Sequence, residues 1–228
     1  MRAETADASL AADIHACTRC PRLVDWRREA AADPPRRYRG QRYFARPLAG
    51  FGDPDGRIVV VGLAPAAHGG NRTGRVFTGD RSADWLYAAM HRAGLANQPE
   101  SVAIDDGLAL EDVYVSMIVR CPPPANKPTP AERDNCVPWF ERDLEQLGRA
   151  RVLLALGAFA WDGILRGLRG LGHELPRPKP RFGHGAEAAI GPYALLGSFH
   201  VSQQNTFTGK LTEPMLDAVF ARARELAG

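Results

Sequence analysis

Four cysteines are the residues of this chain whose spacing most directly predicts chemistry. Cys17 and Cys20 form a C-x-x-C pair, and Cys121 and Cys136 follow much later in the sequence. Four thiolates bind structural zinc or an iron–sulfur cluster, and the spacing alone does not choose between them. Two disulfides are the alternative, although thiols stay reduced in the cytoplasm. The cysteines therefore predict a metal site that ties an N-terminal helical arm, residues 7–32, to later parts of the chain.

A glycine-rich loop at residues 62–80 lies between the second and third cysteines. It matches neither the phosphate-binding loop of nucleotide hydrolases nor the dinucleotide fingerprint. The backbone N–H groups of Gly69 and Gly70, together with the side chain of Arg72, are suited to phosphate oxygens. A flexible turn is the alternative interpretation of these glycines. The loop is therefore a candidate for contact with a phosphate or a base.

The elements that must position these residues follow from the pattern of apolar residues. Short apolar runs predict four buried strands, at residues 57–63, 113–119, 151–157 and 193–199. Helical spacing predicts helices at residues 82–94, 130–148, 158–168 and from about 214 onward. Ser82 and Thr129 are the expected N-caps of the first two of these helices. Pro-, Gly- and Arg-rich stretches at residues 33–56 and 122–130 indicate loops.

Strands that alternate with helices predict an α/β fold. We expect a three-layer αβα sandwich with a central, mostly parallel four-stranded sheet. The loops at residues 62–80, 120–130 and 200–210 all follow predicted strands, and sites in such sheets form at the carboxyl ends of the strands. We therefore expect these loops to converge. The whole chain, residues 1–228, is expected to form one domain and to act as a monomer, with no protein partner indicated.

Composition and charge narrow the class of partner. The sequence has no run of about 18 apolar residues and no signal peptide, which predicts a cytoplasmic protein. The net charge is +3, but residues 22–46 hold eight arginines against three acids. Residues 176–185 form a second basic stretch without acids. Such clusters favour polyanions, although each could also be an ordinary solvated surface.

Several motifs resemble those of the family 5 uracil-DNA glycosylases. Residues 62–68 (GLAPAAH) and 72–80 (RTGRVFTGD) are similar to the first motif of that family, and residues 120–130 (RCPPPANKPTP) to its central cysteine loop. His200 begins HVSQQN, which resembles the His-x-Ser motif shared across the superfamily. The four-cysteine layout agrees, and the resemblance spans about residues 13–225. It implies the uracil-DNA glycosylase fold and a DNA repair enzyme, acting in the cytoplasm on the nucleoid.

The resemblance implies roles for residues around the everted base, and each has a simpler alternative. Breaking a glycosidic bond requires donors for the leaving base, a stacking surface and negative charge near the sugar. His200 is implied as the donor to the leaving base, or else it only caps a strand. Phe77 is implied as the stacking surface, or else it is a core residue. Asn126 is implied as the reader of the base edge, or else it is a turn residue.

The carboxylate needed near the sugar is not where related families place it. Related families place a carboxylate or amide early in the first motif, where this chain has Leu63 and Ala64. Asp80 is then the best remaining carboxylate, to position water or stabilise the sugar cation. Its alternative is the N-cap of the following helix. Weak general-base help is compatible with a dissociative path, because the base departs before water attacks.

The implied substrates are uracil and deaminated purines such as hypoxanthine and xanthine, in DNA. Gly62, Ala64 and Ala66 are expected to line the base pocket and leave room for a larger base, with His68 as a further contact. No lysine is placed for a Schiff base, so we expect a monofunctional enzyme. The remaining expected DNA contacts are Asn71, Ser202, Gln203, Asn205, Phe207 and Lys210, with Phe207 a candidate wedge.

The cofactor follows from the same resemblance. It favours a structural [4Fe-4S] cluster over zinc at Cys17, Cys20, Cys121 and Cys136. A non-catalytic nucleic-acid-binding protein with a four-cysteine zinc site would explain the arginines and cysteines, but not the two motifs together. An iron–sulfur electron-transfer protein would explain the cysteines alone.

Overall fold

The four predicted strands form the centre of one sheet. The computed structural model describes residues 8–228. In it β2 (Ile58–Gly62), β3 (Val113–Met117), β4 (Val152–Leu156) and β6 (Tyr193–Ser198) pair in parallel in the order β3-β2-β4-β6. Almost every residue of these strands is buried. Parallel strands covered on both faces need such continuous apolar runs, which is why the sequence predicts them well.

The sheet is wider than the four strands expected, and it is mixed. β1 (Phe51–Gly52) pairs antiparallel with β3, and β5 (Glu187–Ile190) pairs antiparallel with β6. The full order is β1-β3-β2-β4-β6-β5. The α/β prediction is confirmed, but the count of four strands is wrong. The two edge strands are short and partly exposed, so no apolar run marks them in the sequence.

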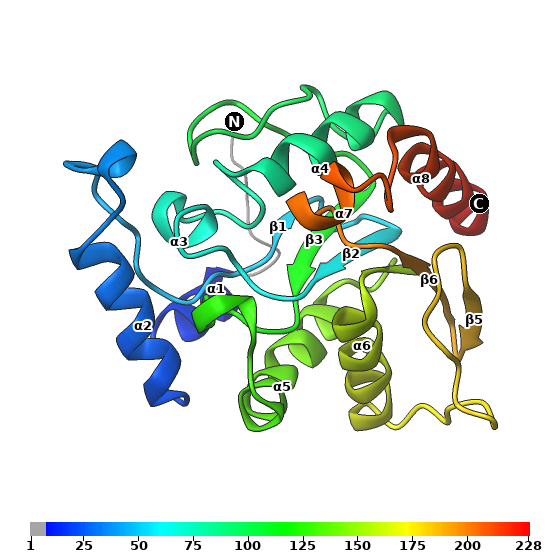
Figure 1. Ribbon diagram of the computed structural model, residues 1–228. Coiled ribbons are helices and arrows are strands. Elements are labelled where there is room, and N and C mark those ends of the chain that lie inside the picture. Colours follow the sequence, from blue (N-terminus) through cyan, green and yellow to red (C-terminus); the bar gives the residue numbers. More distant parts are fainter. Residues whose placement is uncertain (1–7) are drawn as a thin grey trace.

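Helices cover both faces of the sheet and complete the three layers (Figure 1). α4 (Arg81–Arg92) and α8 (Glu213–Ala227) pack against each other on one face. α5 (Pro130–Gln146) and α6 (Ala158–Gly170) pack against each other on the opposite face. Each pair closes a separate apolar core, and alternate residues of the strands point into one core or the other.

The N-terminal arm is two helices rather than one. α1 (Ala8–His15) ends before the C-x-x-C pair, and α2 (Pro21–Ala32) begins directly after it. Residue 7, the first of the expected arm, lies outside the described residues. Pro21 suits the first position of α2, because a proline there removes an N–H that would have no helical partner. The break places Cys17 and Cys20 in the turn between the helices. Within residues 8–228, every helix is too short or too polar to span a membrane.

Helix caps confirm one sequence prediction and correct another. Thr129 caps α5 through a reciprocal capping box with Glu132, as its position predicts. The cap of α4 is Asp80 rather than Ser82. The carboxylate Oδ1 of Asp80 accepts hydrogen bonds from the backbone N–H groups of Ser82 and Ala83, at 2.9 and 3.1 Å.

Candidate active site

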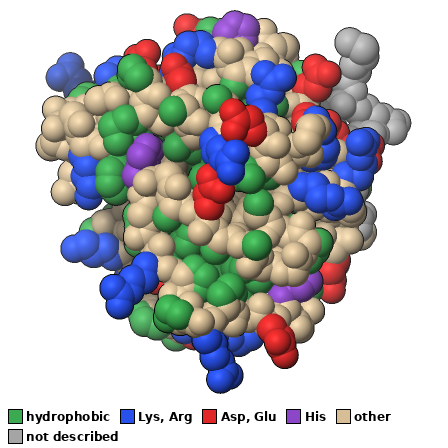
Figure 2. All heavy atoms as spheres, turned by 90° about the vertical axis from the view of Figure 1, so that its right-hand side faces the viewer, with side chains coloured by type: hydrophobic (Ala, Val, Ile, Leu, Met, Phe, Trp, Pro, Cys, Tyr) green, Lys and Arg blue, Asp and Glu red, His purple; other side chains and the backbone are tan. Residues whose placement is uncertain are grey.

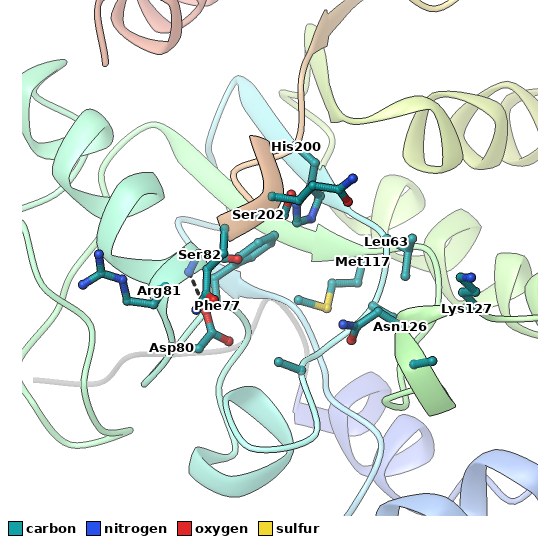
Figure 3. A pocket seen from close by; sticks show the side chains of 15 residues that line it. Leu63, Phe77, Asp80, Arg81, Ser82, Met117, Asn126, Lys127, His200 and Ser202 are labelled. Atoms are coloured by element: carbon teal, nitrogen blue, oxygen red, sulfur yellow. Dashed lines mark hydrogen bonds between the residues drawn. The ribbon is translucent and has the colours of Figure 1, made fainter. Parts of the chain in front are cut away.

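The three predicted loops meet around one cavity at the carboxyl edge of the sheet. The cavity has a volume of about 600 Å³, within the range of small-molecule sites. Its walls come from the loop after β2, from the end of β3 with the proline-rich loop, and from the segment after β6. Phe77, Asp80, Asn126 and His200 all line it, and Figure 3 shows them around a common space. The expected convergence is confirmed.

Phe77 forms the inner wall and is held in an unusual backbone conformation. Its φ is +47°, in the left-handed region that non-glycine residues seldom adopt. The ring is 5% exposed and covers Gly62, where a Cβ atom would lie 2.7 Å from the ring. Gly62 is therefore required as glycine for the ring to pack this closely against the end of β2. Strain of this kind persists when the surroundings fix it, and it is common at functional sites.

Asp80 is both a helix cap and a wall of the cavity. Its Oδ1 is used by the N-terminus of α4, while Oδ2 has no hydrogen-bond partner within residues 8–228. Gly69 lies against that oxygen, and a Cβ atom there would be 2.0 Å from Oδ2. Burial raises the pKa of Asp80, although the two backbone N–H groups oppose this. Asp80 is thus the N-cap of α4 and also lines the cavity, while its part in catalysis stays a prediction.

His200 stands opposite Asp80 across the cavity, next to Phe77 (Figure 3). The centroids of the Phe77 and His200 rings are 6.2 Å apart. Burial lowers the pKa of His200 to about 4, so the imidazole is neutral at physiological pH. Asn205 donates a hydrogen bond of 2.8 Å to the backbone carbonyl of His200. Asn205, expected to contact DNA, is half-buried and positions the histidine.

Asn126 enters the cavity from the proline-rich loop. Both Ala125 and Asn126 have left-handed backbones, with φ of 52° and 56°. This conformation follows three prolines and turns the amide of Asn126 toward the space facing His200 (Figure 3). Within residues 8–228 the amide has no hydrogen-bond partner, so its donor and acceptor are both free. A neighbouring side chain, Lys127, lies at the far side of the cavity from Asp80.

In the loop after β2, two small residues line the cavity, whereas two polar residues expected at the site point elsewhere. Ala64 and Ala66 line the cavity, as expected. His68 does not; its Nδ1 is 2.9 Å from the hydroxyl oxygen of Tyr43, outside the cavity. Asn71, expected at DNA, is fully buried in α3 (Gly70–Thr73). Its amide donates to the backbone carbonyls of Arg27 and Ala67, each at 3.2 Å.

The remaining expected phosphate contacts in this loop have internal partners. Arg72 donates hydrogen bonds to the backbone carbonyls of His68 and Gly79, at 2.8 and 3.0 Å. The N–H of Gly69 is bonded to the carbonyl of Ala66, and Gly70 is buried. These residues therefore shape the loop in this structure.

The segment after His200 forms the outer rim. Gln203 begins a short helix, α7 (Gln203–Phe207), and Ser202 is its N-cap residue. Ser202, Gln203 and Gln204 line the cavity. Phe207 is 69% exposed, with the guanidinium of Arg81 5.7 Å from its ring centroid. Lys210 is exposed and lies 4.8 Å above the ring of Phe199. These exposed side chains remain available for contact with DNA.

Several wall residues were not singled out from the sequence. Met117 forms the floor, and Arg81, Ser82 and Gln204 stand at the rim. Met117 lies near the end of the strand predicted at residues 113–119 and pairs with Gly62, the first residue of the first motif, so its position was a usable signal.

The cysteines gather on the other side of the proline-rich loop. Cys121 and Cys136 are buried and Cys17 and Cys20 are half-buried, and all four are free thiols. Burial raises the pKa of Cys121 to about 11 and that of Cys136 to about 12, and charge on the other cysteines adds to both. Within residues 8–228, however, no group of three or more His, Cys, Asp or Glu side chains is arranged so that it could hold a metal ion.

Donors around the sulfurs fit a group that holds thiolates. Arg27 donates to the Sγ of Cys121 at 3.1 Å, and the backbone N–H of Arg120 donates to the Sγ of Cys136 at 3.2 Å. The amide of Asn135 lies 3.7 Å from the Sγ of Cys20. Arg27 is 4% exposed, so its charge is directed at a sulfur in a dry environment. N–H donors to coordinating sulfurs are a usual outer shell of thiolate-bound metals.

Comparison with known proteins identifies the fold family. A family model described as the uracil DNA glycosylase superfamily matches residues 49–224. The chain belongs to the uracil-DNA glycosylase superfamily. The match spans β1 to α8, and so includes every wall of the cavity.

Close relatives extend the similarity over nearly the whole chain. A type-5 uracil-DNA glycosylase of Mycobacterium tuberculosis is 51% identical over 217 residues, covering 94% of this chain and 80% of the relative. That of Thermus thermophilus is 50% identical over 218 residues, covering 94% and 95%. That of Pyrobaculum aerophilum is 43% identical over 212 residues, covering 93% and 89%. The resemblance to family 5 drawn from the motifs is confirmed.

Proposed function

We propose that this protein removes uracil and other deaminated bases from DNA by hydrolysing the glycosidic bond. The observation that carries the proposal is the convergence of Phe77, Asp80, Asn126 and His200 on one cavity. An enzyme that acts on a base must take it out of the stack, and the cavity offers a place for the everted base. The type-5 relatives are named as uracil-DNA glycosylases, which supports uracil as the base.

In this proposal Phe77 and Asn126 bind the base. Phe77 is rigid because its ring is wedged against Gly62, so it offers a fixed apolar face. The amide of Asn126 has a donor and an acceptor without a hydrogen-bond partner among residues 8–228. Its left-handed backbone holds the amide at the cavity, so it can pair with the edge of a base without reorganising the loop.

His200 stabilises the departing base. A neutral imidazole has one N–H to donate, and the low pKa of His200 keeps the ring neutral at physiological pH. Negative charge develops on a base oxygen only as the glycosidic bond breaks, so the donor acts on the transition state. One such donor contributes about 3–4 kcal/mol. Asn205 holds the backbone of His200 in place from α7.

Asp80 acts on the sugar side. Its Oδ2 has no hydrogen-bond partner in the part of the chain that the structure describes, and two N–H groups at the start of α4 hold the other oxygen in place. The helix cap therefore holds the carboxylate in place through Oδ1 and leaves Oδ2 to act on the sugar. Positive charge develops on the sugar while the bond breaks, and a nearby carboxylate stabilises it and orients water.

The wall residues Ala64 and Ala66 support a broad range of bases. Small side chains leave the cavity wide enough for a purine such as hypoxanthine or xanthine. Ala66→Tyr would narrow it, so we expect release of hypoxanthine to fall more than release of uracil in single-turnover assays. Equal losses on both substrates would contradict the idea that cavity width sets the range.

We propose a monofunctional reaction that leaves an abasic site. Lys127 is the lysine on the cavity wall, and it lies across the cavity from Asp80 rather than beside it. Borohydride reduction during turnover should therefore trap no covalent protein–DNA complex. A trapped complex that disappears in Lys127→Gln would show a Schiff base and a lyase step.

The function is tested with a duplex that carries one uracil. We expect free uracil by chromatography, and strand breaks only after alkali. Asp80→Asn and His200→Asn, prepared in parallel, control for contaminating enzymes and should be much slower. DNA binding without base release by the wild-type protein would instead support a non-catalytic nucleic-acid-binding protein.

We propose a structural [4Fe-4S] cluster at Cys17, Cys20, Cys121 and Cys136. The donor set supports it, as do the N–H groups and the Arg27 guanidinium directed at the sulfurs. A cluster would brace the arm of α1 and α2 against the proline-rich loop that carries Asn126. Protein purified without oxygen should contain iron and sulfide and be yellow-brown. A colourless protein with one zinc would overturn the assignment.

A further inference from the structure

A short arginine-rich segment remains unexplained by the cavity chemistry. Residues 34–46 hold five arginines and no acid. They contain the turn η1 (Arg36–Tyr38), which lies at the left edge of Figure 1 beside α3. All five are exposed: Arg36, Arg37, Arg39, Arg42 and Arg46. No carboxylate of residues 8–228 forms an ion pair with any of them, so their charge is not neutralised within the described protein.

Several other surface arginines of this chain are paired with acids. On α8 and its neighbours, Arg92 pairs with Asp217 at 2.7 Å, and Arg222 pairs with Glu187 at 2.7 Å. Figure 2 shows this side of the molecule, and red acidic side chains flank blue basic ones near its centre. The arginines of residues 34–46 therefore differ from an ordinary mixed surface. An unneutralised cluster is the arrangement that attracts a polyanion.

The segment is fixed to the back of the cavity wall. The backbone N–H of Phe44 donates to the carbonyl of Arg72 at 3.1 Å, and that of Ala45 donates to the carbonyl of Asn71 at 3.0 Å. Arg72 in turn donates to the side-chain oxygen of Gln41 and to the carbonyl of Gly79. Gly79 is the residue before Asp80, so one arginine joins the segment to the loop that lines the cavity.

The aromatic residues of the segment are already in contact with protein. The guanidinium groups of Arg37 and Arg72 lie 4.7 and 4.4 Å from the ring centroid of Tyr38, and His68 stacks beside that ring. The hydroxyl of Tyr43 contacts His68. These rings build a rigid base for the arginines and offer no open face for a nucleobase. The chemistry left exposed is guanidinium, which suits phosphate oxygens.

We propose that residues 34–46 bind the phosphate backbone of DNA beside the everted nucleotide, independently of sequence. Arg36, Arg39 and Arg42 make the contacts, while Tyr38, Arg72 and His68 hold the segment in position. Its attachment to the cavity loop sets the distance between the gripped phosphates and the cavity. This inference rests on the proposed function, which identifies DNA as the ligand. The arginine segment binds undamaged DNA as well as damaged DNA.

The test compares two triple variants with equal loss of charge. Arg36→Gln, Arg39→Gln and Arg42→Gln are combined in one protein. The control combines Arg169→Gln, Arg177→Gln and Arg181→Gln. These three arginines are exposed and form no ion pair within residues 8–228. They belong to α6 and to the second basic stretch, on the other side of Figure 1 from residues 34–46. Affinity for an undamaged duplex is measured by fluorescence anisotropy over a series of salt concentrations. Urea unfolding checks that all three proteins are equally folded.

We expect the first variant to bind about tenfold or more weakly, and its salt dependence to be shallower by about 0.9 in the log–log slope for each lost phosphate contact. The control should stay close to wild type. Equal losses in both variants would show a non-specific charge effect and overturn the assignment, as would unchanged affinity and slope in the first. Retained DNA affinity with lost binding to anionic vesicles would overturn it in favour of a membrane surface.

This experiment is independent of base release. If the wild-type protein releases no uracil but the first variant still loses salt-dependent DNA binding, the surface stands and the proposed function fails. If uracil release is normal and the first variant binds as the wild type does, the surface fails alone.

Discussion

Two groups of polar residues near the loop after β2 differ in their hydrogen bonding: one is saturated within the protein and the other is not. Behind the cavity loop, Arg75 is 4% exposed and donates to Thr78, Ser101 and Asp106. Asp106 accepts the N–H groups of Val102, Ala103 and Leu108 in addition. At the cavity, Asp80 Oδ2 and the amide of Asn126 have no partner within residues 8–228, and the ring of His200 forms no hydrogen bond there.

This difference in hydrogen bonding separates residues that hold the loop in place from residues that line the cavity. Burial alone raises the pKa of Asp106, but Arg75 and the backbone N–H groups lower it to about 2, so the ion pair stays charged at any physiological pH. Ser101 also accepts the N–H of Gly79 through its carbonyl, which fixes the residue next to Asp80. A saturated network holds the loop, and the unsaturated groups it supports are left for a ligand.

The largest effect is expected from breaking the saturated group. Asp106→Ala leaves the buried Arg75 cation without its anion, which destabilises a protein by about 3–5 kcal/mol. Urea unfolding should show this loss. Asp105→Ala is the matched control, because that neighbouring carboxylate is exposed and should leave the midpoint unchanged. Equal stability of both variants would mean that the network does not hold the fold.

The cavity group should respond in activity instead of stability. His200→Asn shortens the side chain and moves its N–H donor away from the proposed position of the departing base, so single-turnover release of uracil should fall about 10²–10³-fold. The urea midpoint should stay near that of the wild type. If His200→Asn unfolded at a lower urea concentration than the wild type but released uracil at the normal rate, His200 would have a structural role only.

A smaller effect is expected at Asp80, which belongs to both groups. Asparagine caps a helix about as well as aspartate does, so Asp80→Asn keeps α4 capped while removing the charge. We expect base release to fall about tenfold or more, because the sugar cation loses its carboxylate. Affinity for DNA should stay near normal. If Asp80→Asn released the base as fast as the wild type does, Asp80 would act only as the helix cap.

The smallest expected effect is on the pH profile. Because the imidazole is neutral from pH 7 down to about 4, release rates should show no inflection near 6.5, the ordinary histidine pKa. The rate should fall at lower pH, because Asp80 becomes protonated as the pH falls through its raised pKa. A rate inflection near 6.5 that vanishes in His200→Asn would contradict a neutral donor.

The lowered pKa of His200 also affects folding stability. Its contribution is complete above about pH 6.5 and is lost as the pH falls toward about 4.

The sequence predicts the centre of the fold better than its edges. The four parallel strands are continuous apolar runs, and burial on both faces demands such runs. β1 has two residues and β5 reads Glu-Ala-Ala-Ile, so neither carries a strand pattern of its own. Both exist because the open edges of β3 and β6 supply hydrogen-bond partners.

The site shows the same limit at the level of single side chains. Strand order predicts that Asp80, Asn126 and His200 meet, because loops at the carboxyl ends of parallel strands share one edge. It does not predict which way each residue of a tight turn points. The single turn of α3 directs Asn71 inward to the carbonyl of Arg27, while His68 just before it faces Tyr43. Neither direction is encoded in a local pattern.

Base removal in this cavity requires that a nucleotide leaves the duplex and enters the cavity before its glycosidic bond is cut. Stopped-flow fluorescence tests it, with 2-aminopurine placed next to uracil and the slow Asp80→Asn protein. We predict a fluorescence rise that precedes any release of uracil and is absent when an intact G·C pair replaces the uracil. An identical signal on both duplexes, or uracil release with no earlier rise, would contradict the account.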